Sequence, residues 1–340
     1  VFHSIVFSPV LDVSMLKAIS WSLAMATIVS AWFGLDAGER ERLSSLLFWG
    51  LVSLLLLSLP LLMLPAIGYL RNGTGFQGVL NHPQAFGPTM AILGVWAGSR
   101  IFAHSRPPWS LLSIFIGCFV MIVLSEARTA GLAMVLGLGG VLFITPALAG
   151  RAISSVLPGV RSKRFVGFLV LIGILALASG PLIAEKVVGY IFSKSGRQES
   201  TSILDAYETS RGGLIEKMAS NISARPLEGI GFGMASIPSE LVVVRDPVFG
   251  LPVSAAVEKG VLPLAIVEEI GVVGFGVVLL WVLALLRMSA RAGVAPVAVC
   301  LTALFLNMGE ATLFSPGGLG LLMLIMLGWA ASSSLEGEAR

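Results

Sequence analysis

The sequence predicts an all-α membrane protein, a polytopic bundle of transmembrane helices with one large extracytoplasmic loop. The chain of 340 residues is 56% hydrophobic and 12% charged, with a mean hydropathy of +0.93, whereas roughly a quarter of the residues in soluble domains are charged. Apolar runs of about 20 residues recur along it, and a helix of that length crosses the hydrocarbon with its backbone groups paired internally. A single soluble core is therefore excluded.

The apolar runs indicate roughly nine spans. The run at 43–69 carries Pro60 and Pro65, which predict a kink or a break. The run at 109–149 is divided only by Ser125-Glu-Ala-Arg128, a group too polar for the middle of a bilayer without partners. The expected spans are 14–33, 43–69, 83–98, 109–124, 127–149, 165–184, 262–286, 293–309 and 313–332.

Lysines and arginines near the span ends set the expected orientation, because they are retained in the cytoplasm. They gather in the loops 99–108, 150–164 and 286–292, which all fall on one side. The opposite, extracytoplasmic side then receives the loop 70–82, the turn at 125–128, the segment 185–261 and the turn near Glu310. The chain divides accordingly into N-terminal helices (1–184), a large extracytoplasmic loop (185–261) and C-terminal helices (262–340).

The segment 185–261 is the longest stretch outside the expected spans, and loops of such length are usually functional. Apolar residues recur among polar ones over about 202–221 in a rough amphipathic pattern that suits a helix lying at the membrane interface. The glycine-rich element Pro226–Gly233 cannot continue a helix, so it predicts a tight turn or a close backbone approach.

Several other classes of protein and site are excluded or disfavoured. A net charge of +3 without a dense basic run argues against nucleic acid as a partner. The three histidines are scattered and no Cys, His or carboxylate spacing fits a metal, so neither a metal nor a cofactor is expected. Cys118 and Cys300 fall inside apolar runs, where a thiol behaves as a small hydrophobe. The stretch 1–13 begins with Val1 and has no charged leader with a cleavage site, so further residues are expected to precede it.

Cations on the extracytoplasmic side are the candidate ligands of an anion. Arg128 lies in a turn between two apolar runs, where it either binds an anion, pairs with Glu126 or reaches lipid headgroups. Arg211 is otherwise a solvated charge and Lys259 a helix anchor. Two carboxylates, Glu268 and Glu269, fall about two turns into an expected span, so they should face the interior of the bundle.

Taken in order, these elements resemble the O-antigen ligase and polymerase superfamily, membrane proteins that transfer lipid-linked glycans. The resemblance covers about 70–285. One departure is that ligases of this family place a His-Asn pair some ten residues before a Glu-x-Gly, whereas this chain has Lys259-Gly260 there, which favours a polymerase over a ligase. The matching elements are Arg71-Asn-Gly-Thr-Gly-Phe76, Asn81-His-Pro-Gln84, Ser125-Glu-Ala-Arg-Thr-Ala130, Ser210-Arg211, Pro226-Leu-Glu-Gly-Ile-Gly-Phe-Gly233 and Glu269-Ile-Gly271.

The resemblance implies a GT-C-like, metal-independent, inverting glycosyltransferase in the bacterial cytoplasmic (inner) membrane, with its active site facing the periplasm. Its donor would be an undecaprenyl-pyrophosphate-linked glycan of an O-antigen or exopolysaccharide, and its acceptor another glycan or the lipid A core. The leaving pyrophosphate is assigned to Arg71, Arg128, Arg211 and Lys259, and the catalytic group to Glu258, Lys259 and Glu269, with Glu258 and Glu269 both open as the general base.

Two other classes of function remain open. A transporter or flippase for an anionic lipid-linked substrate would also need many spans and a cationic cavity, although such proteins usually bind near the midplane, between repeated halves. A membrane scaffold would use the long loop only to dock another protein. Cations that gather in one cavity favour the enzyme over the scaffold.

Overall fold

The computed structural model describes residues 1–71, 75–149, 157–167, 170, 212–255, 257 and 259–337. This part of the chain is predominantly helical, and it adds one two-stranded sheet that the sequence did not predict. Within it, four helices are long and apolar enough to cross a membrane: Leu11–Gly34, Ala37–Met63, Arg128–Ala147 and Leu262–Ala292. These helices are consistent with an all-α membrane protein. The full set of roughly nine spans stays a prediction.

The described residues belong to two compact units, each assembled from separate parts of the chain. Unit 1 comprises Val1–Phe33, Tyr207–Ala284 and Asn307–Ile325, and unit 2 comprises Gly34–Ala206, Leu285–Leu306 and Met326–Arg340. The predicted division into N-terminal helices, a large loop and C-terminal helices describes the order along the chain and stays a prediction.

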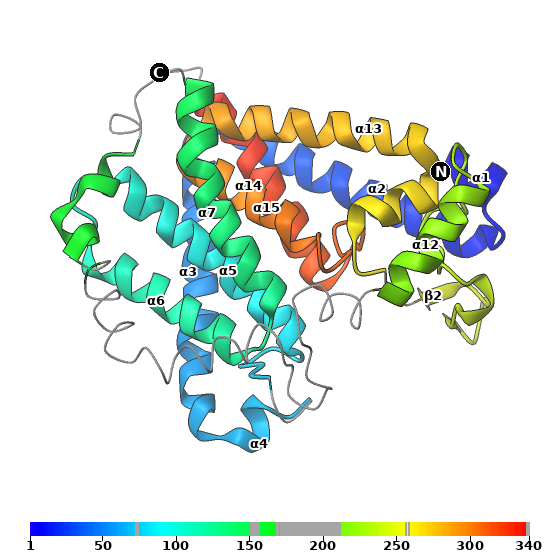
Figure 1. Cartoon of the computed structure of the whole chain (residues 1–340), viewed down its shortest axis with the longest axis horizontal. Helices are drawn as coiled ribbons and strands as arrows, with labels where there is room; N and C mark the ends of the chain where they lie inside the picture. Colours follow the sequence, from blue (N-terminus) through cyan, green and yellow to red (C-terminus); the bar gives the residue numbers. More distant parts are fainter. Residues whose placement is uncertain are drawn as a thin grey trace. The chain divides into compact units, whose positions relative to one another are not determined.

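Unit 2 is built around α5, of which seventeen residues are buried. Figure 1 shows α5 among α6, α7 and α14. The Trp96 ring of α5 lies edge-on to Phe48 of α3 and tilted on Trp329 of α15. Its helical elements are α3 (Ala37–Ser58), η1 (Leu59–Met63), α4 (Pro65–Gly68), α5 (Pro83–Ala103), α6 (Trp109–Leu124), α7 (Arg128–Ala149), η2 (Pro158–Arg161), α14 (Val294–Leu306), α16 (Ser334–Gly337) and the ends of α13 and α15.

Local sequence explains where several helices of unit 2 begin and end. A capping box starts α3, because Asp36 accepts the Glu39 N–H while the Glu39 side chain accepts the Asp36 N–H. The break expected in the run 43–69 is confirmed, since α3 ends at Ser58 and η1 and α4 each have proline at their start. The turn expected at 125–128 is confirmed between α6 and α7.

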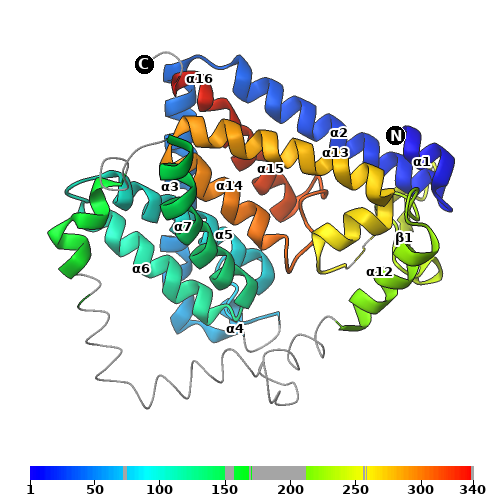
Figure 2. The same ribbon diagram turned by 45° about the horizontal axis from the view of Figure 1, so that its top comes forward.

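Unit 1 contains α2 and the first part of α13, which run side by side in Figures 1 and 2. The edge of Trp21 meets Trp281 between them, and Trp21 donates a hydrogen bond to the Leu313 carbonyl. The elements of unit 1 are α1 (Phe2–Phe7), α2 (Leu11–Gly34), α12 (Gly213–Ala224), η4 (Pro238–Glu240), β1 (Val243–Arg245), β2 (Pro252–Ala255), α13 (Leu262–Ala292) to Ala284, and the start of α15 (Gly318–Ser332).

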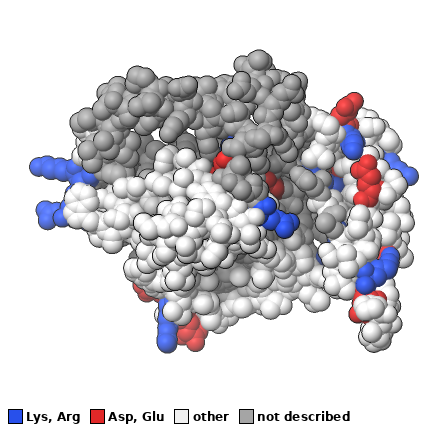
Figure 3. Space-filling model, turned by 90° about the horizontal axis from the view of Figure 1, so that it is seen from below, with Lys and Arg blue, Asp and Glu red and all other residues white. Residues whose placement is uncertain are grey.

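Two of the expected helices have different bounds in the structure, and a third expected helix lies mostly outside the described residues. The helix expected over 202–221 is described from Gly213 to Ala224, and its first part lies outside the described residues, as does most of the span expected at 165–184. The run 313–332 becomes a helix only from Gly318, because residues 307–317 form a turn. On the face shown in Figure 3, Lys, Arg, Asp and Glu occupy a small part of the described surface.

Candidate functional site

A break in α13 positions the site of unit 1. Gly271 has φ 67° and ψ 178°, so the helix is interrupted two residues after Glu269. The glycine-rich element 226–233 fills the break: Ile230 and Gly231 donate their N–H groups to the carbonyls of Glu268 and Glu269 at 2.8 and 2.9 Å. These two carbonyls, which the break frees from the helix, are therefore satisfied by the protein itself, as an irregular helix within a membrane would require.

The close approach expected of the glycine-rich element is confirmed at this contact. Gly229, Gly231 and Gly233 all have positive φ, and a Cβ at Gly229 would meet the backbone of Glu269. Val272 beyond the break donates its N–H to the Pro226 carbonyl at 2.9 Å. The two sequence elements Pro226–Gly233 and Glu269–Gly271, far apart in the chain, thus form one unit of structure.

A buried cluster of charges lies against this loop. Lys259 Nζ is 2.6 Å from Glu268 Oε2 and 3.1 Å from Glu269 Oε1, and the three side chains are 2%, 0% and 13% exposed. The expectation that Glu268 and Glu269 face the interior is confirmed. A buried ion needs both an opposite charge and further hydrogen bonds, and here one ammonium is shared by two carboxylates.

Neutral donors satisfy the remaining carboxylate oxygens. Asn221 Nδ2, from α12, donates to Glu268 Oε1 at 2.7 Å, and Ser236 Oγ donates to Glu268 Oε2 at 3.1 Å. Glu269 Oε2 accepts the Gly233 N–H at 2.6 Å. The side chain of Glu269 is thereby fixed at both oxygens, by Lys259 on one and by the glycine-rich loop on the other.

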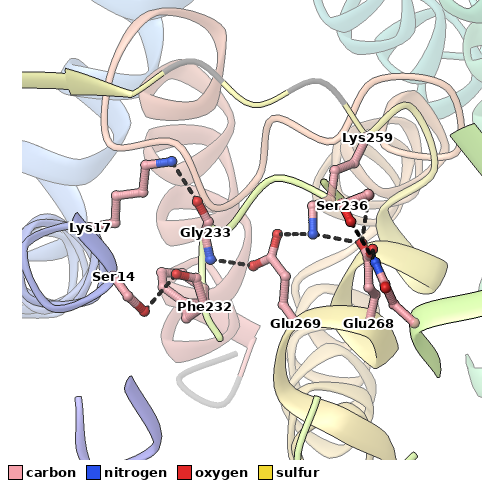
Figure 4. Close-up of polar contacts among 9 residues, drawn as sticks. Ser14, Lys17, Phe232, Gly233, Ser236, Lys259, Glu268 and Glu269 are labelled. Carbon is pink, nitrogen blue, oxygen red and sulfur yellow. Dashed lines mark hydrogen bonds and ion pairs between the residues drawn. The ribbon is translucent and has the colours of Figure 1, made fainter. Parts of the chain in front are cut away.

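The N-terminal helix α2 adds a second lysine to the cluster. Figure 4 shows Gly233 between Lys17 and Glu269: Lys17 Nζ donates to the Gly233 carbonyl at 2.7 Å, while the Gly233 N–H is held by Glu269. Ser14, one turn earlier, donates to the Phe232 carbonyl at 2.7 Å. Sequence reasoning missed Lys17, although an ammonium within an apolar span is itself a signal of a functional site.

Two further segments hold this arrangement in place. The apolar face of α12 packs on the start of α13, where Met218, Val261 and Ala265 are buried together. The turn after α14 is tied to the same place, because Leu262 donates its N–H to the Asn307 carbonyl at 2.9 Å. The Asn307 side chain in turn accepts the N–H groups of Thr312 and Leu313 at 2.9 and 2.8 Å. Asn307 was also missed, because nothing in its local sequence indicates a turn that docks on another helix.

Unit 2 brings together two more of the sequence elements that were singled out, the loop after Arg71 and the turn before Arg128. Phe76, in the loop that follows Arg71, donates its N–H to the Leu124 carbonyl at 2.8 Å. Gly87 of α5 faces Ala127 so closely that a Cβ would overlap it. The loop 75–82 with the start of α5 and the turn 125–128 therefore lie side by side. Arg128 is the first residue of α7, and Glu126 before it has a left-handed conformation, φ 56°.

The predicted site residues fall into three groups. Lys259 and Glu269 are in contact in unit 1, whereas Arg71 and Arg128 belong to unit 2. Arg211 and Glu258 lie outside the described residues. Among the residues that the structure describes, no group of three or more His, Cys, Asp or Glu side chains is arranged to hold a metal ion.

The geometry changes what Lys259 can do chemically. Its charge is already balanced by two buried carboxylates, so in this state it holds Glu268 and Glu269 in position rather than presenting a bare cation. Lys17 differs, because the hydrogen bond that it makes goes to a carbonyl and its side chain is only partly buried. An ammonium has three donors, so Lys17 retains capacity for an anion.

Comparisons with known proteins give no support for or against these site assignments. No protein-family model matches the chain, and no curated protein is significantly similar to it.

Proposed function

We propose that this protein is a membrane glycosyltransferase that polymerises or ligates an undecaprenyl-pyrophosphate-linked glycan on the outer face of the bacterial cytoplasmic membrane. One observation carries the proposal: the elements on which the family resemblance rests meet in pairs, although they are distant in sequence. The glycine-rich element 226–233 docks on Glu268–Gly271 beside Lys259, and the loop after Arg71 docks on the turn before Arg128.

The proposed reaction is a displacement at the anomeric carbon of the donor sugar. A hydroxyl oxygen of the acceptor forms the new C–O bond, the bond from the anomeric carbon to the pyrophosphate oxygen breaks with inversion, and the hydroxyl proton passes to a carboxylate. Glu269 and Glu258 are the candidate bases. The pyrophosphate that leaves gains negative charge, and Arg71, Arg128 and Arg211 are assigned to stabilise it because fixed cations need no reorganisation during the reaction.

The contacts of unit 1 refine the roles of its two lysines. Lys259 is proposed as the positioning residue that keeps Glu269 oriented, since both of its partners are carboxylates within 3.1 Å. Lys17 is proposed as the additional cation for the pyrophosphate, since it lies on the other side of the same glycine-rich loop and makes its hydrogen bond to a neutral carbonyl.

One observation favours the second candidate, a transporter or flippase. Transporters place their binding groups on discontinuous helices, and α13 is discontinuous at Gly271. Against this, three backbone groups at the break, the carbonyls of Glu268 and Glu269 and the N–H of Val272, are bound by residues 226–231 and not left to a substrate. The enzyme is therefore the preferred proposal, and the two are separated by whether a covalent product forms.

The test uses purified protein in proteoliposomes with radiolabelled undecaprenyl-pyrophosphate-linked glycan and a glycan acceptor. We expect Arg128→Ala to reduce formation of the longer glycan and release of undecaprenyl pyrophosphate by roughly 100-fold or more, as when a group that stabilises transition-state charge is removed. Arg106→Ala is the matched control, because Arg106 is exposed in the loop between α5 and α6, on the opposite side of the predicted topology. Its activity should be unchanged.

Full transfer by Arg128→Ala would overturn the assignment of the site. Movement of the labelled lipid across the vesicle without any covalent product would favour the flippase instead. In cells, deletion of the gene distinguishes the two forms of the enzyme, because a polymerase defect shortens the surface polysaccharide and a ligase defect leaves finished chains on their lipid carrier.

A further inference from the structure

The antiparallel hairpin β1–β2 of unit 1 presents an unusually apolar surface. Val248 and Phe249 at its tip are 76% and 79% exposed, and Val253 on β2 is 70% exposed. None of these residues belongs to an expected span. Monomeric soluble surfaces rarely gather exposed apolar side chains in this way, so such a patch marks a contact with a partner or a membrane.

The tip is a well-formed turn that holds these side chains outward. Asp246 Oδ2 accepts the N–H groups of Val248 and Phe249 at 3.0 and 2.6 Å. Its backbone closes the turn as well, because Gly250 donates its N–H to the Asp246 carbonyl and Asp246 donates its own to Leu251. An aspartate that binds the backbone two and three residues ahead fixes a turn, so the exposure of Val248 and Phe249 belongs to a defined structure.

An ion pair joins the hairpin to the first turn of α2, a candidate membrane span. Arg245, the last residue of β1, lies 2.5 Å from Asp12 in the first turn of α2. Since α2 is a candidate span that begins at Leu11, this pair lies where the helix enters the apolar layer. Arg245 also donates to the Gly250 carbonyl at 3.0 Å, which ties the tip to the same level.

A second exposed apolar side chain belongs to α1, in the same unit. Figures 1 and 2 both place the hairpin beside α1 and α12, and Phe2 of α1 is 79% exposed. Apolar side chains flanked by an ion pair at the end of a span are typical of segments that rest in the interfacial layer of a bilayer.

We propose that the tip of the hairpin, Val248 and Phe249, inserts into the outer boundary of the membrane, with lipid acyl chains as its partner. Lipid is favoured over another protein because the hairpin is fixed at the level at which α2 enters the membrane. The consequence concerns the site, since β2 ends at Ala255, four residues before Lys259. Insertion would hold the segment that carries Lys259 against the lipid surface. The inference depends on membrane insertion of α2 and not on the proposed glycosyl transfer.

The test places a fluorescent probe at the tip. Phe249→Cys is labelled with a polarity-sensitive fluorophore and reconstituted in phosphatidylglycerol–phosphatidylethanolamine nanodiscs. Background labelling should be low, because the chain has two cysteines and both Cys118 and Cys300 are buried. The matched control is Glu240→Cys, whose native side chain is 65% exposed and polar in the same unit.

We expect doxyl groups attached to lipids near the headgroup to quench the probe at position 249 at least twofold more than the probe at 240. Aqueous iodide should show the opposite order. Strong iodide quenching at 249 would mean that the tip lies in water and would overturn the proposal. Shielding from both quenchers would overturn it equally, since the tip would then be covered by protein. Unchanged elution on gel filtration verifies that each labelled variant is folded.

Discussion

At the scale of single residues, the buried ion cluster is costly unless all of its members are present. Removing a charge from water costs several kcal/mol, and the attraction between Lys259 and the two glutamates compensates for this only because Asn221, Ser236 and the Gly233 N–H satisfy the other oxygens. The cluster therefore holds the side chains of Lys259, Glu268 and Glu269 in one defined arrangement. Its members are expected to be interdependent.

Lys259→Met tests this interdependence. The change leaves two carboxylates buried without their cation, so we expect a loss of about 3–5 kcal/mol of stability, measured as a lowered Tm in one detergent. Lys217→Met is the control, because Lys217 pairs with Glu240 at 3.7 Å on the surface and should cost less than about 1 kcal/mol. Adding Glu268→Gln to Lys259→Met should restore part of the stability, since one unpaired carboxylate is removed. Equal Tm shifts for the two lysine variants would contradict the role assigned to the cluster.

The burial of Glu268 and Glu269 could be predicted from sequence, because ionised groups within a span are forced to the interior. Their shared partner could not be predicted, since the path of the loop before α13 decides where Lys259 lies. The hydrogen bond from Lys17 to the Gly233 carbonyl could not be predicted either. More than two hundred residues separate it from Gly233, and no local pattern encodes such a contact.

At the scale of secondary structure, the break in α13 is the feature that joins the two sequence elements of unit 1. A continuous helix would pair the carbonyls of Glu268 and Glu269 internally and leave no acceptors for Ile230 and Gly231. The positive φ of Gly271 and its contact with the Leu227 carbonyl both require the absence of a side chain. The break in α13 therefore depends on the glycine at position 271.

Gly271→Ala should damage this joint. A non-glycine residue at positive φ costs roughly 1–3 kcal/mol, and the new Cβ would overlap the Leu227 backbone. We expect a lower Tm and faster proteolysis of the loop that contains residues 226–233. Gly276→Ala, five residues on in the same helix, is the control, because a Cβ there meets nothing within 4 Å. Alanine is favoured over glycine inside a helix by about 0.5–1 kcal/mol, so this variant should be as stable as the parent or more so. Tolerance of both changes would show that the break does not depend on Gly271.

The ends of helices agree with the predicted ends where a proline or a polar turn marks them in the sequence. The helix α6 has the bounds of the predicted run 109–124, because Pro108 precedes it and the polar turn 125–128 follows. The hairpin β1–β2 escaped prediction, since strands of three and four residues are too short for an alternating pattern to be distinguished from a loop.

At the scale of the whole molecule, the sequence suggested a linear order of helices, loop and helices, whereas the compact units each draw on three separate parts of the chain. Hydropathy reports which segments avoid water but not which of them pack together. The contacts that assemble unit 1, such as Trp21 on Leu313 and Lys17 on Gly233, depend on tertiary packing. They could not be derived from the pattern of apolar runs.

The predicted orientation of the molecule can be tested with two single-cysteine substitutions in oriented membrane vesicles. Ser105→Cys lies exposed in the loop between α5 and α6, beside Arg106, and Lys217→Cys lies on α12, where the native side chain is 43% exposed. Because basic loops are retained in the cytoplasm, a membrane-impermeant maleimide should label position 217 in right-side-out vesicles and position 105 only in inverted ones. Gel shifts of the labelled protein measure both. Labelling of the two positions from the same side would contradict the predicted topology. Labelling of position 217 only in inverted vesicles would mean that Lys217, and with it the lysine–glutamate cluster that α12 contacts through Asn221, does not face the side on which the lipid-linked donor is proposed to bind.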